Sequence, residues 1–458
     1  MSFLQPLFPP LARPLLAAAA LLALAGAARA TCLDEDKLEA LPPAAAPEAA
    51  TAPAATDPRR SLRQLVADAL ARSQGIGAAR LLAEAAEQDV GEAEAAKKMQ
   101  AGLTASLNPW LESARGANGS SLQARAGINL SQTLWDGGRG DRLVDWRRQQ
   151  AESARLGMLS TQEQITLAAT SMALERSRFR MQAVIHGQNV RKLGCLVQAL
   201  ETIAAADKGR TSELVQARKQ LQQAELQQVQ SQSQARQVEA RLRRMAGDGL
   251  PGTEGMATLL LGVPDLPGVL SAAERSVDIG QLAANARALT EIARVVEAGN
   301  KPQVSWNVGG SALLGSGGGG AGSRSASLSA GVTVSVPILN PAIEYSSQAA
   351  RKRAAAAELQ RADALEQRRQ RIVDVHEQAT AAFDRVRRVG LVLRDSDRLR
   401  NFTLQQWQQM GRRSLFDVLA AETDHYNLRV QYVNALHDGQ QMNATLMSLG
   451  LGIGAWLQ

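Results

Sequence analysis

The stretches 130-LSQTLWDGGRGD-141 and 334-VSVPILNPAIEY-345 decide the fold, because each ends an alternating strand, turns, and opens a long helical stretch. They lie 204 positions apart. A second matching pair, 209-GRTSELVQAR-218 and 411-GRRSLFDVLAAE-422, keeps this spacing, with Glu213 and Asp417 again 204 apart. Equal spacing at both ends predicts two structural repeats with a long helix of equal length in each. That helix is about 68 residues, or roughly 100 Å, long.

Four segments alternate apolar with small polar side chains, two in each repeat: 103–112, 122–131, 304–312 and 325–336. Strands of roughly ten residues with one apolar face are typical of membrane β-barrels, although soluble hairpins alternate too. Four strands cannot close a barrel, and open edges in lipid leave backbone groups unpaired. Three copies supply twelve strands around a wet lumen. We therefore expect an α+β membrane protein with internal duplication. A long α-helical coiled-coil barrel is joined to four β-strands per protomer, which complete a 12-stranded β-barrel as a trimer.

The start of the chain predicts export. Residues 1–30 resemble a signal peptide, with the apolar run 15-LLAAAALLALAGA-27 before Ala28-Arg29-Ala30. Arg29 stands where a lipobox ending at Cys32 needs an aliphatic residue, so we expect no lipidation. No later segment has eighteen uncharged apolar residues, and we expect no transmembrane helix. Residues 31–59, rich in Ala and Pro, are expected to form a disordered leader.

The rest divides into two repeats around a linker. Two long stretches without proline, 110–250 and 342–458, leave room for very long helices. The first repeat, 60–250, is predicted to contain a helix, a β-hairpin at 103–134, a long helix at 139–206 and a helix at 211–247. The linker is 251–275. The second repeat, 276–458, is predicted to contain a helix, a β-hairpin at 303–338, a long helix at 342–408 and a helix at 413–449.

Composition and charge exclude several functions. Aromatic residues are only 3% of the 458-residue chain, which favours helices packed through small side chains. The formal charge of +7 is spread among Glu and Asp, as in 207-DKGRTSELVQARKQLQQAE-225, so no nucleic-acid partner is expected. The two cysteines, Cys32 and Cys195, are far apart and predict neither a disulfide framework nor a metal site.

No catalytic chemistry is expected either. The loop 315-GSGGGG-320 fits a nucleotide-binding glycine pattern but leads into an alternating strand, whereas such a loop must open a helix. The histidines lack metal-ligand spacing, and no nucleophile lies near a base: His186, His376, His425 and His437. We therefore predict a protein that is not an enzyme, with no catalytic, cofactor-binding or metal residues and no cofactor.

The duplicated pattern resembles the TolC family of outer-membrane ducts. The matching pieces are 132-QTLWDGGRG-140, 336-VPILNPA-342, 209-GRTSELVQA-217 and 411-GRRSLFDVLAA-421, and the resemblance covers about residues 60–458. It implies a homotrimer in outer-membrane lipid with a periplasmic helical extension. Its implied partners are a periplasmic adaptor (membrane fusion) protein and an inner-membrane ABC or proton-driven transporter.

The resemblance implies an exit duct, and two substrate classes stay open. One is type I protein secretion, favoured slightly because a lipobox is lacking; the other is small-molecule or multidrug efflux. A rival from another class is a soluble periplasmic helical adaptor. It explains the signal peptide and the long helices, but not two duplicated hairpins.

The resemblance also places a periplasmic gate at the tip turns. Asp417 matches an acidic residue that rings a constriction, Arg413 a basic residue that locks the closed state, and Glu213 an acidic position in the first turn. The second acidic position of the family matches Ala420, so we expect this second acidic ring to be missing, unless Glu422 substitutes. A carboxylate at Asp417 also suits a helix start by charge alone. The expected adaptor-contacting residues are Gly209, Arg210, Ser212, Gly411, Arg412, Ser414 and Leu415.

Overall fold

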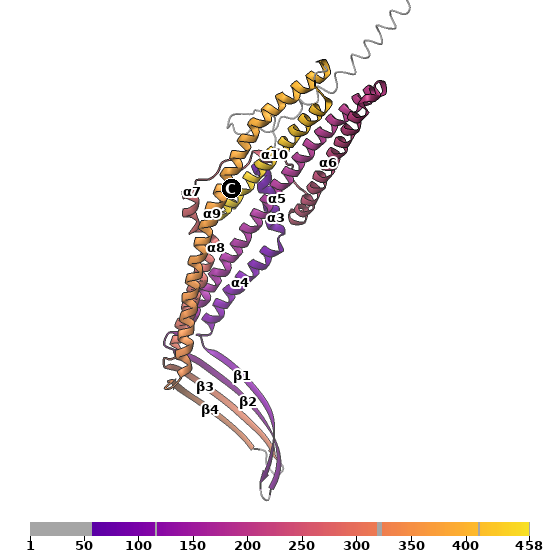
Figure 1. Cartoon of the computed structure of the whole chain (residues 1–458). Helices are drawn as coiled ribbons and strands as arrows, with labels where there is room; N and C mark the ends of the chain where they lie inside the picture. Colours follow the sequence, from indigo (N-terminus) through magenta and orange to yellow (C-terminus); the bar gives the residue numbers. More distant parts are fainter. Residues whose placement is uncertain (1–56, 115–116, 318–322, 411–412, 458) are drawn as a thin grey trace, which may run out of the picture. The chain divides into compact units, whose positions relative to one another are not determined.

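The computed structural model describes residues 57–114, 117–317, 323–410 and 413–457. Long helices and one four-stranded antiparallel sheet make up the fold (Figure 1). The chain divides into two compact units. Among the described residues, the first contains 57–65, Ala169–Val263 and Glu377–Ala444, and the second contains Val66–Ala168, Pro264–His376 and 445–457. Each unit draws on both sequence repeats, so the division into units differs from the predicted division into repeats.

The sheet belongs to the second unit. Its strands are β1 (Gln100–Ala114), β2 (Ala117–Trp135), β3 (Gln303–Gly317) and β4 (Ser323–Ser335), in the order β1-β2-β3-β4 (Figure 1). All neighbours are antiparallel, and the apolar faces meet in register, as in Leu103 opposite Ile128. These apolar side chains are exposed in the single chain, with Leu103 81% accessible and Leu328 83%.

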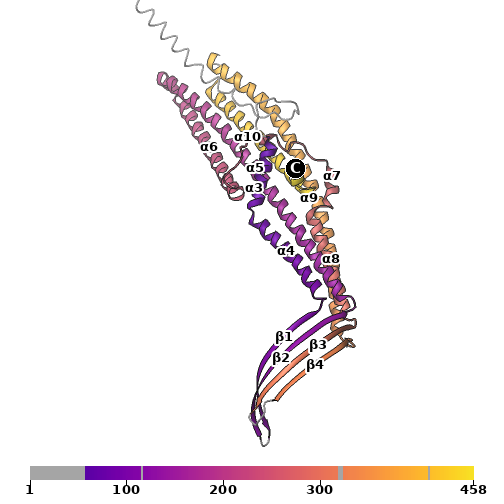
Figure 2. The same ribbon diagram turned by 180° about the vertical axis from the view of Figure 1, so that it is seen from behind.

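The helices of the first repeat follow the sequence closely. α5 (Arg139–Ala206) has the 68 residues that the pattern predicts, and α6 (Thr211–Ala246) lies beside it in both views (Figures 1 and 2). The helix before β1 is divided into α3 (Pro58–Arg72) and α4 (Gln74–Ala95). Ser73 causes the division, because its hydroxyl oxygen accepts a hydrogen bond from the Ile76 amide and caps α4.

The second repeat differs from the first at its long helix. α9 (Pro341–Gln405) has 65 residues and continues into a π-helical turn, η4 (Gln406–Met410), in place of a regular end. The last long helix, α10 (Leu415–Leu449), begins two residues later than predicted because Ser414 caps it. Short helices complete the chain: α7 (Leu266–Ala273), α8 (Val277–Ala298) and α11 (Ile453–Leu457).

No helix among the described residues combines the length and the apolar character that crossing a membrane requires. The predicted signal peptide at 1–30 and almost all of the predicted leader at 31–59 lie outside the described residues.

Candidate functional site

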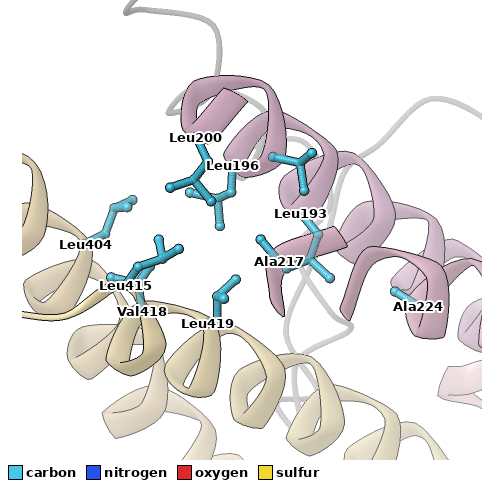
Figure 3. Close-up of a cluster of buried hydrophobic side chains, with 10 residues drawn as sticks. Leu193, Leu196, Leu200, Ala217, Ala224, Leu404, Leu415, Val418 and Leu419 are labelled. Atoms are coloured by element: carbon cyan, nitrogen blue, oxygen red, sulfur yellow. The ribbon is translucent and has the colours of Figure 1, made fainter. Parts of the chain in front are cut away.

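The candidate site is built on an apolar core that joins the ends of two helical hairpins. Leu193, Leu196 and Leu200 of α5 point toward Leu415 and Leu419 of α10 (Figure 3). Leu404 of α9 and Ala217 of α6 complete the group, whose members are at most 6% exposed. Burial of such side chains contributes about 1.5–3 kcal/mol each, so this core holds the two turns together within the first unit.

The first turn joins α5 to α6 through η2 (Lys208–Arg210). Asp207 caps it, with a side-chain oxygen that accepts from the Gly209 amide at 2.9 Å. The Arg210 guanidinium lies 3.7 Å from Glu213 and 3.9 Å from Asp207. Glu213 is 19% exposed at its side chain, so its carboxylate is mostly shielded and faces a cation of its own turn.

The second turn carries a reciprocal cap at the start of α10. The Ser414 amide donates to Asp417 Oδ2 at 3.2 Å, and the Asp417 amide donates to Ser414 Oγ at 3.2 Å. This is the capping-box arrangement, in which each side chain satisfies an otherwise unpaired backbone amide of the other residue. The structural reason for Asp417 is therefore this cap, which the spacing Ser-x-x-Asp encodes in the sequence.

Arg413 lies between that cap and the π-helical turn. Its Nε donates to Gln406 Oε1 at 3.2 Å, and its guanidinium is 3.9 Å from Asp417. Both charged side chains are about half exposed, at 52% and 47%. An exposed pair of this length contributes little to stability, so Arg413 remains available to other anionic groups.

Two residues considered for this site are buried in the single chain. Leu415 is fully buried in the apolar core that joins the two turns, whereas the expected adaptor contact needs it at a surface. Glu422 is also fully buried, 3.6 Å from the guanidinium of Arg400. Both residues lie on sides of α10 that neighbouring helices cover, so packing decides their exposure.

The other residues predicted to contact an adaptor differ in whether the structure describes them. Gly209, Arg210, Ser212 and Ser414 are exposed in the single chain. Gly411 and Arg412 lie outside the described residues. The structure therefore brings Arg413, Ser414 and Asp417 together on one turn, and Arg210 and Glu213 on the other.

A polar clamp on α10 was not anticipated. Gln440 Nε2 donates to the carbonyls of Met256 (3.0 Å) and Leu259 (2.6 Å). Asn443 Nδ2 donates to the carbonyls of Leu260 (2.7 Å) and Gly262 (3.1 Å). Both amides are fully buried and hold the inter-repeat linker, where Leu260 adopts a left-handed φ of 55°. The sequence signal for this clamp was a Gln and an Asn three residues apart within one helix.

Two titratable side chains of the first unit have shifted pKa values. His437, also fully buried, has its pKa lowered to about 4, chiefly because burial disfavours the imidazolium. Burial would raise the pKa of Glu239, but Arg176 and Arg180 beside it lower the pKa below its usual value. Arg176 also donates to the Pro251 carbonyl at 2.6 Å, which ties α5 to the start of the linker.

Cys195 lies in α5, and Cys32, the other cysteine of the chain, lies outside the described residues.

Chemistry-bearing clusters are limited in the described part of the chain. Within it, no group of three His, Cys, Asp or Glu side chains could hold a metal ion. The described end of the glycine-rich stretch, Gly315–Gly317, belongs to β3. A strand on this side and β4 on the other agree with a hairpin connection, which is not the strand-to-helix setting of a nucleotide-binding loop.

Comparison with solved structures identifies proteins of similar fold. No family model and no curated protein matches the chain in sequence. Among solved structures, CusC, described in terms of transmembrane channel formation, matches with a TM-score of 0.77 and 16% identity, covering 86% of this chain and 92% of that one. The outer-membrane protein VceC of Vibrio cholerae matches at 0.71 and 18%, covering 86% and 96%.

The open state of the MtrE outer-membrane channel of Neisseria gonorrhoeae matches with a TM-score of 0.69 and 14% identity. It covers 86% of this chain and 90% of that chain. Identities this low show only that the folds are alike. Each of these matches covers 86% of this chain. The chain therefore has the fold of the TolC-like outer-membrane channels, as its duplicated sequence pattern predicts.

Proposed function

We propose that this protein is a non-enzymatic exit duct of the outer membrane, assembled as a homotrimer. The observation that carries the proposal is the four-stranded sheet with two open edges and an exposed apolar face, joined to helices of 68 and 65 residues. An open edge in lipid leaves unpaired backbone groups, so the sheet needs further strands from other copies. The fold of known outer-membrane channels supports this reading.

The duct requires partners that bring substrate to it. We propose a periplasmic adaptor and an inner-membrane ABC or proton-driven transporter, docked at the two tip turns. The exposed polar residues Arg210, Ser212 and Ser414 would contact the adaptor. The transporter encoded beside this chain distinguishes the substrate classes: an ABC transporter supports protein secretion, and a proton-driven pump supports small-molecule efflux.

Fractionation tests the duct against a soluble periplasmic adaptor. We expect a heat-modifiable trimer in the outer-membrane fraction, released only by detergent. Reconstitution into planar bilayers should then give discrete conductance steps. Recovery of the whole protein as a soluble periplasmic monomer contradicts the proposal.

We also propose that the three copies of Asp417 form an acidic ring where the two turns of each protomer lie. In this proposal Arg413 helps to hold the gate closed, and Glu213 is a further acidic residue in the neighbouring turn. Three like carboxylates around an axis attract cations and repel anions. Asp417 already has a structural role in the cap, so a charge effect must be separated from a folding effect.

Two matched variants separate them. Asp417→Asn keeps an acceptor for the Ser414 amide but removes the charge, and we expect lower cation preference with nearly unchanged stability. Ser414→Ala removes the cap hydroxyl and should cost about 1 kcal/mol while leaving cation preference intact. Equal ion selectivity in Asp417→Asn and the unmodified channel means that Asp417 is only a capping residue.

Arg413→Ala tests the restraint. Loss of its contacts with Gln406 and Asp417 should raise the resting conductance, because the turn loses two side-chain links. Arg413→Lys, which keeps the charge, serves as the matched control. An unaltered resting conductance in Arg413→Ala contradicts the restraint.

A further inference from the structure

A cavity of about 440 Å³ lies within the second unit of the chain. Its walls come from α5, the start of α8, α9, and the turn between α10 and α11. A volume of this size is in the range of sites that hold small molecules. The cavity shares no residue with the two turns of the candidate site, which belong to the first unit.

One wall is an ion-paired group whose charges compensate each other. Arg368 Nη1 lies 2.9 Å from Asp278 Oδ2, and Asp278 Oδ1 accepts a hydrogen bond from the Ser160 hydroxyl. Arg368 also donates to the carbonyls of Leu449 (2.9 Å) and Ser448 (3.2 Å) at the end of α10. These contacts fix the wall in place and leave it close to neutral.

The start of α8 forms a second wall. Ser276 is the N-cap residue of this 22-residue helix, but its side chain makes no capping hydrogen bond. The residue is 5% exposed, and its hydroxyl has no hydrogen-bond partner among the described residues. Buried polar groups almost always have a partner, and a serine hydroxyl turns by rotation about a single bond. Ser276 therefore marks a position where a ligand in the cavity can supply the missing partner.

The same wall favours an anionic group. The first amides of a helix and its dipole attract negative charge. Arg275 precedes Ser276, lines the cavity and is exposed, and no ion pair of its guanidinium occurs within the described residues. Asp278, the acid in the first turn, directs its carboxylate to Ser160 and Arg368 instead. A ligand carboxylate would meet a cation, a hydroxyl and helix amides here.

Glu163 on α5 supplies the opposite charge. Its Oε1 accepts from the Ile453 amide at 2.6 Å, and no hydrogen bond of Oε2 occurs within the described part of the chain. A Cβ added at Gly452, whose φ is +95°, would lie 3.0 Å from Oε2, and one added at Gly454 would lie 3.7 Å from it. The glycines of this turn therefore leave room beside a half-buried carboxylate oxygen, which suits an ammonium group.

The two charged ends belong to one cavity that also has an apolar part. Ser160 lies about one helical turn before Glu163 and hydrogen-bonds Asp278, which follows Ser276 by two residues. Apolar side chains from several elements line the same cavity: Leu70, Leu159, Val277 and Leu451. The cavity thus offers a site for an anion, a site for a cation and an apolar surface.

We propose that this cavity binds a free amino acid with an apolar side chain. Its carboxylate is held by Arg275, the Ser276 hydroxyl and the first amides of α8, and its ammonium group by Glu163. Its side chain packs on the apolar lining. One chain supplies every group, so the site does not depend on the proposed assembly of the duct.

A series of related ligands tests the recognition of both charges. Isothermal titration calorimetry of the full-length protein in detergent would use L-leucine, leucine amide and N-acetyl-L-leucine as probes. The amide lacks the carboxylate, and the acetyl compound lacks the ammonium group. We expect saturable binding of L-leucine to each chain, and binding of both blocked compounds that is weaker by about tenfold or more.

Two outcomes of this series overturn the proposal. One is the absence of saturable L-leucine binding up to about 10 mM. The other is equal affinity for L-leucine and either blocked compound, which means that the cavity recognises only one charged group. Neither outcome depends on a substituted chain that could fail to fold.

Substitutions then assign the two ends. Glu163→Gln keeps an acceptor for the Ile453 amide but removes the charge, and should weaken L-leucine by about tenfold without weakening N-acetyl-L-leucine. Arg275→Gln should weaken L-leucine without weakening leucine amide. Arg353→Gln, at an exposed position of α9 outside the cavity, is the matched control and should bind as the unmodified protein does.

Unchanged L-leucine affinity in both site variants overturns the assignment of the ligand to this cavity. Equal weakening in Arg353→Gln overturns it too, because the loss would then reflect net charge rather than a site.

Discussion

Replacing Gln440 by Met tests whether the buried amides on α10 hold the inter-repeat linker. Gln440→Met keeps the length and flexibility of the side chain but removes the Nε2 donor. The carbonyls of Met256 and Leu259 then lose hydrogen bonds of 3.0 and 2.6 Å. Both residues are at most 8% exposed, so water replaces those bonds poorly without local opening.

The magnitude follows from the bonds lost. The Met256 carbonyl still accepts from the Leu259 amide at 3.3 Å, so losing its bond to Gln440 costs about 0.5–1.5 kcal/mol. The buried Leu259 carbonyl loses its bond to Gln440, which costs about 1–3 kcal/mol. Part of this loss is offset, because Gln440 Oε1 is buried without a hydrogen bond among the described residues, and Met removes that group. We therefore expect a net loss of about 2 kcal/mol in the free energy of opening the linker.

Amide hydrogen exchange of residues 256–262 measures this opening directly. A loss of about 2 kcal/mol corresponds to roughly 30-fold faster exchange of linker amides that exchange by local opening. Gln431→Met is the matched control, since it makes the same substitution at an exposed position of α10. If Gln440→Met and Gln431→Met exchange within about twofold of each other at these amides, the clamp does not hold the linker.

Three further predictions concern buried groups of the first unit. The folded-state pKa of His437 is about 4, below its usual 6.5, so the unfolded chain binds the extra proton. Stability should fall by about 3 kcal/mol as pH drops from 6.5 to 4, and thermal unfolding of His437→Asn should lose most of this dependence. Arg400→Met should destabilise by about 3–5 kcal/mol by removing the guanidinium that lies 3.6 Å from the buried Glu422 carboxylate. Urea unfolding should show substantial recovery when Glu422→Leu is added, and no recovery means that the pair is not coupled. Leu419→Ala should cost about 2–5 kcal/mol, seen as faster exchange of tip amides, while an unchanged rate there would mean that the core does not hold the turns.

The sequence predicted the elements better than their ends. α5 spans the predicted residues because its start and its end are both marked by turn residues. At the second turn, nothing in 404-LQQWQQM-410 predicts the π-helical geometry, because that geometry depends on how α9 meets the apolar core that joins the two turns. The capping box depends only on the local spacing Ser414-x-x-Asp417, so this feature is encoded in the sequence.

Residue exposure could not be predicted at the site. Leu415 and Glu422 lie in a helix whose apolar and polar residues are interleaved, so the buried face is set by the neighbouring helices. The Gln440 and Asn443 clamp escaped prediction for the same reason, because its acceptors are carbonyls more than 180 residues away.

By itself, the sequence determined the repeat, the strands and the long helices, because periodicity, turn residues and a constant offset are local or additive signals. The tertiary structure alone decided which polar residues are buried and what they bind. Burial depends on which helix faces meet, and Glu422 lies beside Arg400 through such a contact, whereas the cap formed by Asp417 is local. Side chains of similar chemistry thus serve as an exposed cap at one position and a buried ion pair at the other.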